Sequence, residues 1–258
     1  MMRLIRYNRR SLLAVVAALL FCFGAAAQDA PFFDTSRPDR FLTFGLRLGL
    51  NSSGVRTNYL DVQSEVVQNN FYWRMGGQVG AVADLHIRRF FGIEVGLFGV
   101  NRSYDCALMG ANIQDDYMGS RFVHSRFTYL SVPVMLSFKC NILKGAVMQF
   151  DLGSYWAYGI AGKKKMDSYI SFGGEGGQLV FDRSSTKDNY FGADPKDFLA
   201  VNRTDVGIRI GTGLTFFDHY FIGLYYQNST RNNAKNRKGS PHYKIRNRGW
   251  DISLGYNF

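Results

Sequence analysis

The stretch Trp250-Asp251-Ile252-Ser253-Leu254-Gly255-Tyr256-Asn257-Phe258 shows how the rest of the chain is built. Its even-numbered residues are large and apolar or aromatic, whereas its odd-numbered residues are small or polar. A period of two is typical of a β-strand with one apolar and one polar face. In a soluble sheet such a final strand would be an edge open to aggregation. The pattern instead favours a strand that closes a barrel within a lipid bilayer.

The length of this stretch supports the same interpretation. The steps from Trp250 to Phe258 span roughly 26 Å along a strand. A tilt of about 40° reduces this length to a height of roughly 20 Å, close to the apolar band of about 25 Å on outer-membrane barrels.

Residues 1–27 have the features of a cleaved signal peptide. Four arginines precede an apolar run over residues 11–23, and Ala25-Ala26-Ala27 provides the small residues for cleavage before Gln28. A transmembrane anchor is the alternative, but it needs about 20 apolar residues, and this run is shorter. We therefore expect an exported protein with an irregular lead-in over residues 28–40.

The charge and the cysteines bear on the same expectation. The formal net charge of +11 falls to +7 (11 − 4) when the four arginines of the signal peptide are removed. Two cysteines then remain, Cys106 and Cys140, and the default in an exported protein is a disulfide. The topology below puts them at opposite ends of a barrel, too far apart to bond. We expect two free thiols.

Segments with a period of two predict eight β-strands. They span residues 41–51, 71–87, 91–104, a strand that ends with 129–139, 147–162, 199–216, 220–228 and 250–258. The connections alternate between long and short, and the long ones cover 52–70, 105–121, 163–197 and 229–243. Outer-membrane barrels combine short periplasmic turns, long extracellular loops and an even number of strands. Pro133 falls inside a strand and predicts a local defect in its ladder.

The predicted fold is therefore all-β. It is an eight-stranded antiparallel up-and-down transmembrane β-barrel over residues 41–258, with short periplasmic turns and long extracellular loops. The final strand is expected to pair with the strand that begins at Phe41. Eight strands leave an interior filled by side chains rather than an aqueous channel.

The alternation alone leaves two possible orientations of the strands. A lipocalin-type barrel would place the apolar face inside and the polar face in water. Here the polar face is rich in glycine, which fits a narrow, crowded interior and would weaken a water-facing strand. It also carries charges of both signs, which can pair inside a barrel, so we expect the apolar face to point outward. The expected interior polar network consists of Arg47, Arg74, Glu94, Asp151, Asp205, Arg209 and Asp251.

Several segments resemble a known family. They are Phe44-Gly45-Leu46-Arg47-Leu48-Gly49, Tyr129-Leu130-Ser131-Val132-Pro133-Val134, Gly153-Ser154-Tyr155-Trp156-Ala157-Tyr158-Gly159, Asp205-Val206-Gly207-Ile208 and the aromatic C-terminus. With them, the mature chain resembles the small outer-membrane β-barrel proteins of Gram-negative bacteria, of the porin-like or PorT-like type. The resemblance implies an outer-membrane location. It also implies that the outer-membrane assembly machinery reads the last strand through Trp250, Ile252, Leu254, Tyr256 and Phe258.

No catalytic, metal or cofactor site is predicted. His124 and Ser125 are adjacent, so on a strand they face opposite sides and cannot act as a dyad. His86 shares a face with Asp84 and is expected in the polar interior. The sequence contains no G-x-S-x-G, H-E-x-x-H or nucleotide-binding loop, and its cysteines and histidines do not cluster at ligand spacings.

Basic residues gather in two of the expected extracellular loops. No acidic residue lies between Asp218 and Asp251, and residues 163–165 are three consecutive lysines. The expected basic outer rim consists of Lys163, Lys164, Lys165, Arg231, Lys235, Arg237, Lys238, Lys244 and Arg246. Such a rim suits contact with anionic lipid headgroups or with an acidic partner, and the lipid headgroups are favoured. A solvated loop that keeps the surface hydrophilic is the alternative. Charge alone does not indicate nucleic-acid binding.

Three functions fit this architecture. The first is an envelope structural or surface-interaction protein that acts through its long basic loops. The second is an outer-membrane component of a secretion or assembly machine, as the PorT-like resemblance implies. The third, less favoured, is a lipid-modifying outer-membrane enzyme.

Overall fold

The computed structural model describes residues 31–58, 66–112, 117–173, 179–191, 200–235 and 244–258. The expected signal peptide, residues 1–27, lies outside these residues. Within them, the chain forms nine antiparallel strands and no helix that could cross a membrane. The strands are β1 (Leu42–Thr57), β2 (Val66–Arg88), β3 (Phe91–Asn112), β4 (Tyr117–Leu143), β5 (Ala146–Gly173), β6 (Leu179–Asn189), β7 (Thr204–Phe216), β8 (Tyr220–Ser229) and β9 (Ile245–Asn257).

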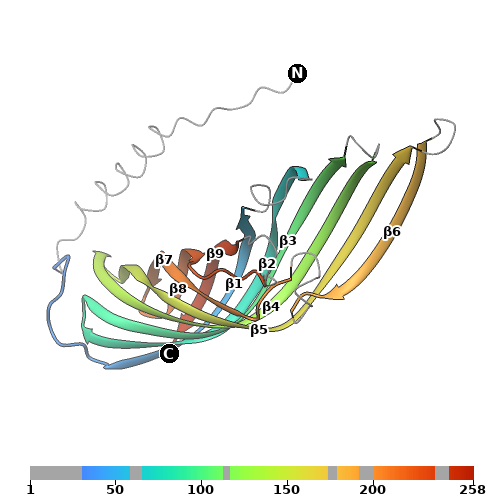
Figure 1. Cartoon of the computed structure of the whole chain (residues 1–258). Coiled ribbons are helices and arrows are strands. Elements are labelled where there is room, and N and C mark those ends of the chain that lie inside the picture. The colour runs from blue at the N-terminus through green and yellow to red at the C-terminus, as the bar shows by residue number, and fades with distance from the viewer. Residues whose placement is uncertain (1–30, 59–65, 113–116, 174–178, 192–199, 236–243) are drawn as a thin grey trace, which may run out of the picture.

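A ring of strands forms the body of the molecule (Figure 1). The sheet order among the described residues is β4-β3-β2-β1-β9-β8-β7-β5-β6, and β4 also pairs with β5, which closes the ring through eight of the nine strands. The last strand pairs with the first as predicted, with Leu50 opposite Ile252 and Leu48 opposite Leu254. The predicted antiparallel up-and-down barrel is therefore confirmed.

The ninth strand, β6, corrects the prediction. It pairs with β5 over Lys163–Gly173, in a region that we expected to be the longest loop. The strands β2 to β5 also continue past the ring, so most of the loops predicted at 52–70, 105–121 and 163–197 are paired strands instead. The prediction was wrong because the lipid-facing alternation ends at the membrane boundary, whereas backbone pairing continues beyond it.

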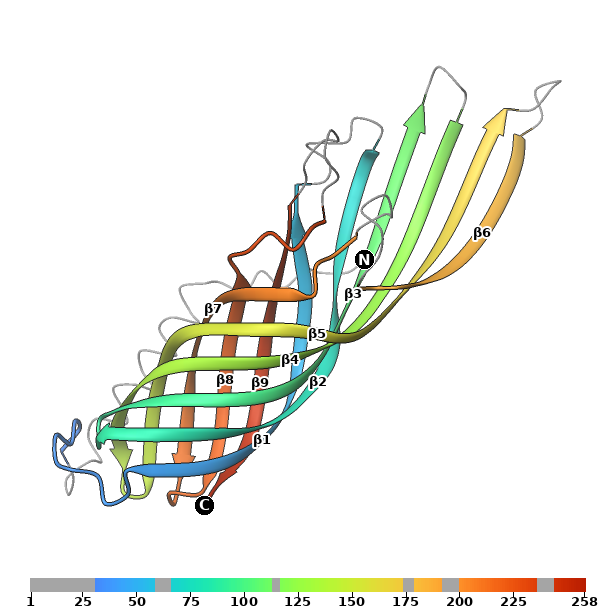
Figure 2. The ribbon, with the colours of Figure 1, turned by 60° about the horizontal axis from the view of Figure 1, so that its bottom comes forward.

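We call the extended part of the sheet the fin. It consists of residues 66–74 of β2, 104–112 of β3, 117–126 of β4, 163–173 of β5, and all of β6. Figure 2 shows the fin rising beyond the ring at the end opposite to the C-terminus. The short turns between β2 and β3, β4 and β5, and β7 and β8 lie at the other end, which we call the turn end.

The outer surface of the ring is apolar, as expected. Leu46, Leu48 and Leu50 of β1 are 56%, 66% and 61% exposed, and Leu254 beside them on β9 is 59% exposed. Their neighbours along the same strands, such as Arg47 and Asp251, are buried. An exposed leucine column beside buried charges is the reverse of a soluble barrel and fits lipid on the outside.

Two smaller predictions are also confirmed. In the β3–β4 ladder no residues are paired between Val95–Val134 and Phe98–Ser131, so the ladder is interrupted beside Pro133 while its register is kept. Cys106 and Cys140 are both buried free thiols.

Candidate functional site

Two buried ion pairs cross the middle of the barrel. Arg209 of β7 lies 2.9 Å from Asp251 of β9, and Arg47 of β1 lies 3.9 Å from Glu94 of β3. The guanidinium groups also stack on rings, Arg47 at 4.1 Å from the centroid of Phe221 and Arg209 at 4.4 Å from that of Tyr225. Charges this deeply buried need such partners, because unpaired they would be strongly unfavourable.

Asp151 of β5 is held by hydrogen bonds rather than by an ion pair. It accepts hydrogen bonds from the Gln149 amide and the Tyr225 hydroxyl, both at 2.8 Å, and from the Ser137 hydroxyl. Tyr225 therefore joins this carboxylate to Arg209, on which its ring stacks. The middle of the barrel is one connected polar layer.

Asp205 of β7 is the centre of a second layer, nearer the fin. Its carboxylate accepts hydrogen bonds from Asn233 at 3.0 Å and Asn247 at 2.9 Å, and lies 3.7 Å from Arg102. Arg102, on β3, is only 2% exposed and was not predicted. The sequence contains a sign of its burial, because Arg102 lies an even number of residues from Glu94 and so faces the same side of the strand. The apolar alternation that would identify this side fades after Leu97.

An aromatic cluster closes the barrel above Asp205. Tyr190 and Phe191 follow β6 and turn back into the barrel, where Tyr190 stacks on Phe127 with ring centroids 4.3 Å apart. Phe191 meets Tyr129 edge to face at 5.3 Å, and a side chain at Gly159 would collide with the Phe191 ring. Below this cluster, the space between Arg47, Glu94 and Arg209 is about 10 Å³, enough for one water at most.

One residue of the expected interior network lies elsewhere. Arg74 is 53% exposed and pairs with Asp105, on the fin. The register between β2 and β3 shifts between Trp73 and Gln78, and such an irregularity breaks the alternation from which Arg74 was assigned to the interior. The structure places the other six, Arg47, Glu94, Asp151, Asp205, Arg209 and Asp251, inside the barrel.

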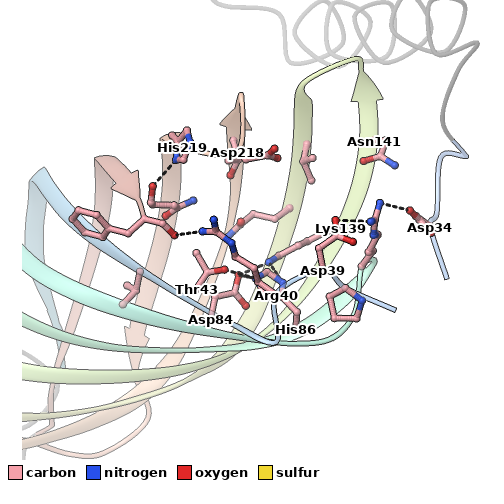
Figure 3. A pocket seen from close by; sticks show the side chains of 18 of the residues that line it. Asp34, Asp39, Arg40, Thr43, Asp84, His86, Lys139, Asn141, Asp218 and His219 are labelled. Carbon is pink, nitrogen blue, oxygen red and sulfur yellow. Dashed lines mark hydrogen bonds and ion pairs between the residues drawn. The ribbon is translucent and has the colours of Figure 1, made fainter. Parts of the chain in front are cut away.

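A cavity of about 540 Å³ opens at the turn end of the barrel, and we call it the vestibule. Figure 3 shows the side chains that line it. Lys139 of β4 forms an ion pair with Asp84 and donates to Nδ1 of His86, at 3.1 Å. Because an ammonium group only donates, the His86 proton lies on Nε2, which bonds the Thr43 hydroxyl at 3.1 Å. Lys139 therefore links Asp84 to His86, and His86 links Lys139 to Thr43.

The described part of the lead-in, residues 31–40, lies across the rim of the vestibule and is held there by ion pairs and hydrogen bonds. Arg89, in the β2–β3 turn, forms ion pairs with Asp34 at 3.3 Å and Asp39 at 2.6 Å. Arg40 donates to the carbonyl oxygen of Phe258 at 3.2 Å. Hydrogen bonds from Ser36 and the nearby Arg89 guanidinium hold the pKa of Asp34 below its usual value. The lead-in therefore joins the turns to the C-terminus.

The residues of the expected basic rim do not form one surface. Lys163, Lys165, Arg231 and Lys244 are exposed, whereas Lys164 is only 2% exposed and lies opposite Asp188 in the β5–β6 ladder. The prediction that Lys164 lies on the exposed rim was wrong. The segment is a strand rather than a loop, and strand alternation buries the Lys164 side chain. Lys235 and Arg246 are partly buried, and Arg237 and Lys238 lie outside the described residues.

The residues of the expected assembly signal line one face of β9. Trp250, Ile252, Leu254, Tyr256 and Phe258 are all exposed on the outer surface. The Phe258 amide donates to the carbonyl of Phe44 at 2.8 Å, so the ladder with β1 continues to the last residue.

No group of three or more metal-ligating side chains lies together in the part of the chain that the structure describes. His124 contacts Asp105 at 2.7 Å on the exposed face of the fin, and Ser125 is buried on the other face, as their alternation predicts.

Comparison with known proteins identifies the architecture. Residues 26–235 match the family described as "Outer membrane protein beta-barrel domain". Ail of Yersinia pestis, solved with the heparin analogue sucrose octasulfate, is similar in structure at 13% identity and a TM-score of 0.39, over 85% of this chain and 100% of Ail. OprG of Pseudomonas aeruginosa is similar at 11% identity and a TM-score of 0.43, over 89% of this chain and 99% of OprG. None of the curated proteins matches the sequence.

Proposed function

Because the chain belongs to the family of outer-membrane β-barrel domains, we propose that it is a non-enzymatic surface-interaction protein whose filled barrel anchors the fin outside the cell. In this orientation the turn end faces the periplasm, since short turns are periplasmic in such barrels. We propose with it that residues 1–27 are removed on export and that residues 41–258 form the barrel domain.

The fin is the observation that carries the proposal. All eight residues from Asp182 to Asn189 of β6 are exposed, so both faces of this strand meet solvent. Eleven residue pairs join β6 to β5, and a paired backbone holds its side chains in a fixed array. A surface ordered in advance loses less entropy on binding than a flexible loop does. The ordered surface of β6 therefore favours binding of a partner over the alternative of a loop that is only solvated.

The barrel interior supports an anchoring role over a transport role. The ion pairs of Arg47 and Arg209 and the aromatic cluster around Phe127 occupy the interior at successive heights. Arg47 and Arg209 are thus engaged with carboxylates inside the barrel, which supports a structural role for these charges. The secretion-machine alternative gains no support from the matched family.

The part of the fin that β5 and β6 form can be removed without changing a residue of the ring. Lys163 and Asn189 are the pair nearest the ring in the β5–β6 ladder, so residues 164–188 can be replaced by a short Gly-rich turn. We expect this variant to reach the outer membrane and to keep its heat-modifiable migration on gels. A photo-crosslinking residue at Ser185, in the intact chain on living cells, is expected to give a discrete protein or glycan adduct. A surface-interaction role would be contradicted if only lipid adducts formed, or if no adduct formed.

We propose two further partners for the barrel itself, outer-membrane lipids and the outer-membrane assembly machinery. Deletion of Phe258 removes one ladder bond to Phe44 and the carbonyl that Arg40 binds, and it shortens the exposed aromatic face of β9. We expect a several-fold drop in the heat-modifiable fraction in cells but normal refolding of the purified chain in detergent. Normal insertion in cells would remove the assembly-signal proposal.

A further inference from the structure

Three arginines lie just beyond the apolar surface of β1 and β9. Along the β1–β9 ladder the outward-facing pairs are Leu50–Ile252, Ser52–Trp250, Gly54–Arg248 and Arg56–Arg246. The surface therefore changes from leucine and isoleucine to an aromatic residue and then to arginine. Arg248 and Arg246 lie roughly 7 and 13 Å beyond Trp250 along the strand, which is about 5 and 10 Å in height at the usual tilt. This is the level of lipid headgroups.

These arginines lack a counter-ion among the described residues. Arg56 and Arg246 are directly opposed across two strands, and like charges in that position destabilise a sheet. None of the ion pairs in the described part of the chain involves Arg56, Arg246 or Arg248. The Nε atoms of Arg246 and Arg248 are buried and have no hydrogen-bond partner among the described residues. An anion at this position would supply the missing counter-charge.

Trp73 forms a platform that orients Arg248. Its ring covers Gly54 so closely that a Cβ at position 54 would lie 3.0 Å from ring carbons. The guanidinium of Arg248 lies 5.1 Å from the centroid of the same ring. A guanidinium stacked on an aromatic face keeps its N–H edge available for a bidentate partner. The pairing of Trp250 with Tyr226, at 4.8 Å, lies directly below.

We propose that Arg56, Arg246 and Arg248 bind a phosphate group of an outer-leaflet lipid. A phosphate offers several acceptor oxygens in the geometry that arginine forks match. The position just above Trp250 favours a lipid phosphate over a free ion, because the lipid anchors its phosphate at that height. The proposal rests on the proposed function only in that the barrel spans the outer membrane, and it does not depend on residues 164–188 of the fin.

The lysines of the fin provide a matched control. Lys163, Lys165 and Lys187 carry the same total charge and are exposed, but they lie on β5 and β6. Lys165 already has a partner, Asp167, at 3.0 Å, and Lys187 is followed by Asp188. A variant with all three changed to glutamine loses as much charge as the arginine variant without touching the arginine site.

The experiment compares lipid binding by the intact chain in phosphatidylcholine nanodiscs. The probes are bisphosphorylated lipid A and the same lipid after dephosphorylation, with retention measured by native mass spectrometry. For the Arg56→Gln, Arg246→Gln, Arg248→Gln variant we expect affinity for the phosphorylated lipid to fall by about tenfold or more. We expect no comparable loss for the Lys163→Gln, Lys165→Gln, Lys187→Gln variant.

Several results would overturn the proposal. Equal loss in the two triple variants would mean general electrostatic attraction rather than a site. Equal retention of the dephosphorylated lipid would exclude recognition of phosphate, and equally tight binding of inorganic phosphate in detergent would assign the site to a free ion. Heat-modifiable migration checks folding of each variant, and the single Arg246→Gln variant is measured if the triple one does not fold. The barrel without residues 164–188 should bind lipid as the intact chain does, which separates this proposal from that of the fin.

Discussion

The ring and the fin are made largely of the same strands, yet their side chains follow different rules. In the ring, β5 alternates exposed Leu152 and Trp156 with buried Asp151 and Tyr155. In the fin, the partner of β5 is β6, which is exposed on both faces from Asp182 to Asn189. Lipid requires every backbone group to be paired and every outward side chain to be apolar. Water imposes neither condition, so a polar sequence can remain a strand there, held by its neighbour alone.

The largest expected difference between the two regions concerns buried and exposed carboxylates. Asp205→Ala in the ring removes the acceptor of Asn233 and Asn247 and leaves Arg102 buried without its counter-charge. Breaking a buried pair costs about 3–5 kcal/mol. We expect a matching loss in the free energy of unfolding, measured by urea denaturation in detergent micelles. Asp188→Ala on exposed β6 is the control, and an equal loss there would remove the distinction.

The aromatic cluster tests whether the loop after β6 stabilises the ring. Phe191 is 4% exposed and packs on Phe127 and Tyr129. Phe191→Ala should lower the free energy of unfolding by about 3–5 kcal/mol, as for other buried phenylalanines. The same denaturation assay measures the loss, and Tyr169→Ala, at a 39% exposed aromatic residue of β5 in the fin, is the comparison. A loss below about 1 kcal/mol would mean that the packing of Phe191 contributes little to the stability of the barrel.

A smaller effect is expected for the ion pair of the fin. Arg74 is half exposed and pairs with Asp105, and exposed ion pairs contribute about 0.2–1 kcal/mol. Arg74→Ala should therefore leave the unfolding midpoint almost unchanged. Arg209→Ala, inside the ring, should be severe. If Arg74→Ala were as damaging, Arg74 would belong to the interior network after all.

The smallest effect concerns pH and the lead-in at the turn end. The pKa of Asp34 is lowered in the folded chain by hydrogen bonds from Ser36 and by Arg89. Docking of the lead-in is thus favoured when Asp34 is ionised, above its usual pKa, and is lost as the pH falls through the lowered pKa. A dye on Phe33→Cys should show greater rotational freedom in acid. Asp34→Asn should show that freedom already at neutral pH, and no change in either case would contradict the role of Asp34.

Some features could be predicted from the sequence because they depend only on local alternation. The outward leucines at 46, 48 and 50, the closing strand at Trp250–Phe258 and the short turns between strands all follow from a period of two. So does the burial of Arg47 and Asp251. Lipid on one side and a narrow interior on the other impose this period on every strand of the ring, so one chain segment is enough to reveal it.

Other features were decided only by the tertiary structure. The pairing of β6 with β5, the return of Phe191 into the barrel and the exposure of Arg74 depend on register shifts and on contacts between distant strands. The meeting of Arg56 with Arg246 depends on the register between β1 and β9, which lie at opposite ends of the chain. Alternation tells which side of a strand a residue faces. Which residue lies opposite it is set by the closure of the barrel, because a shift of strand pairing changes every partner at once.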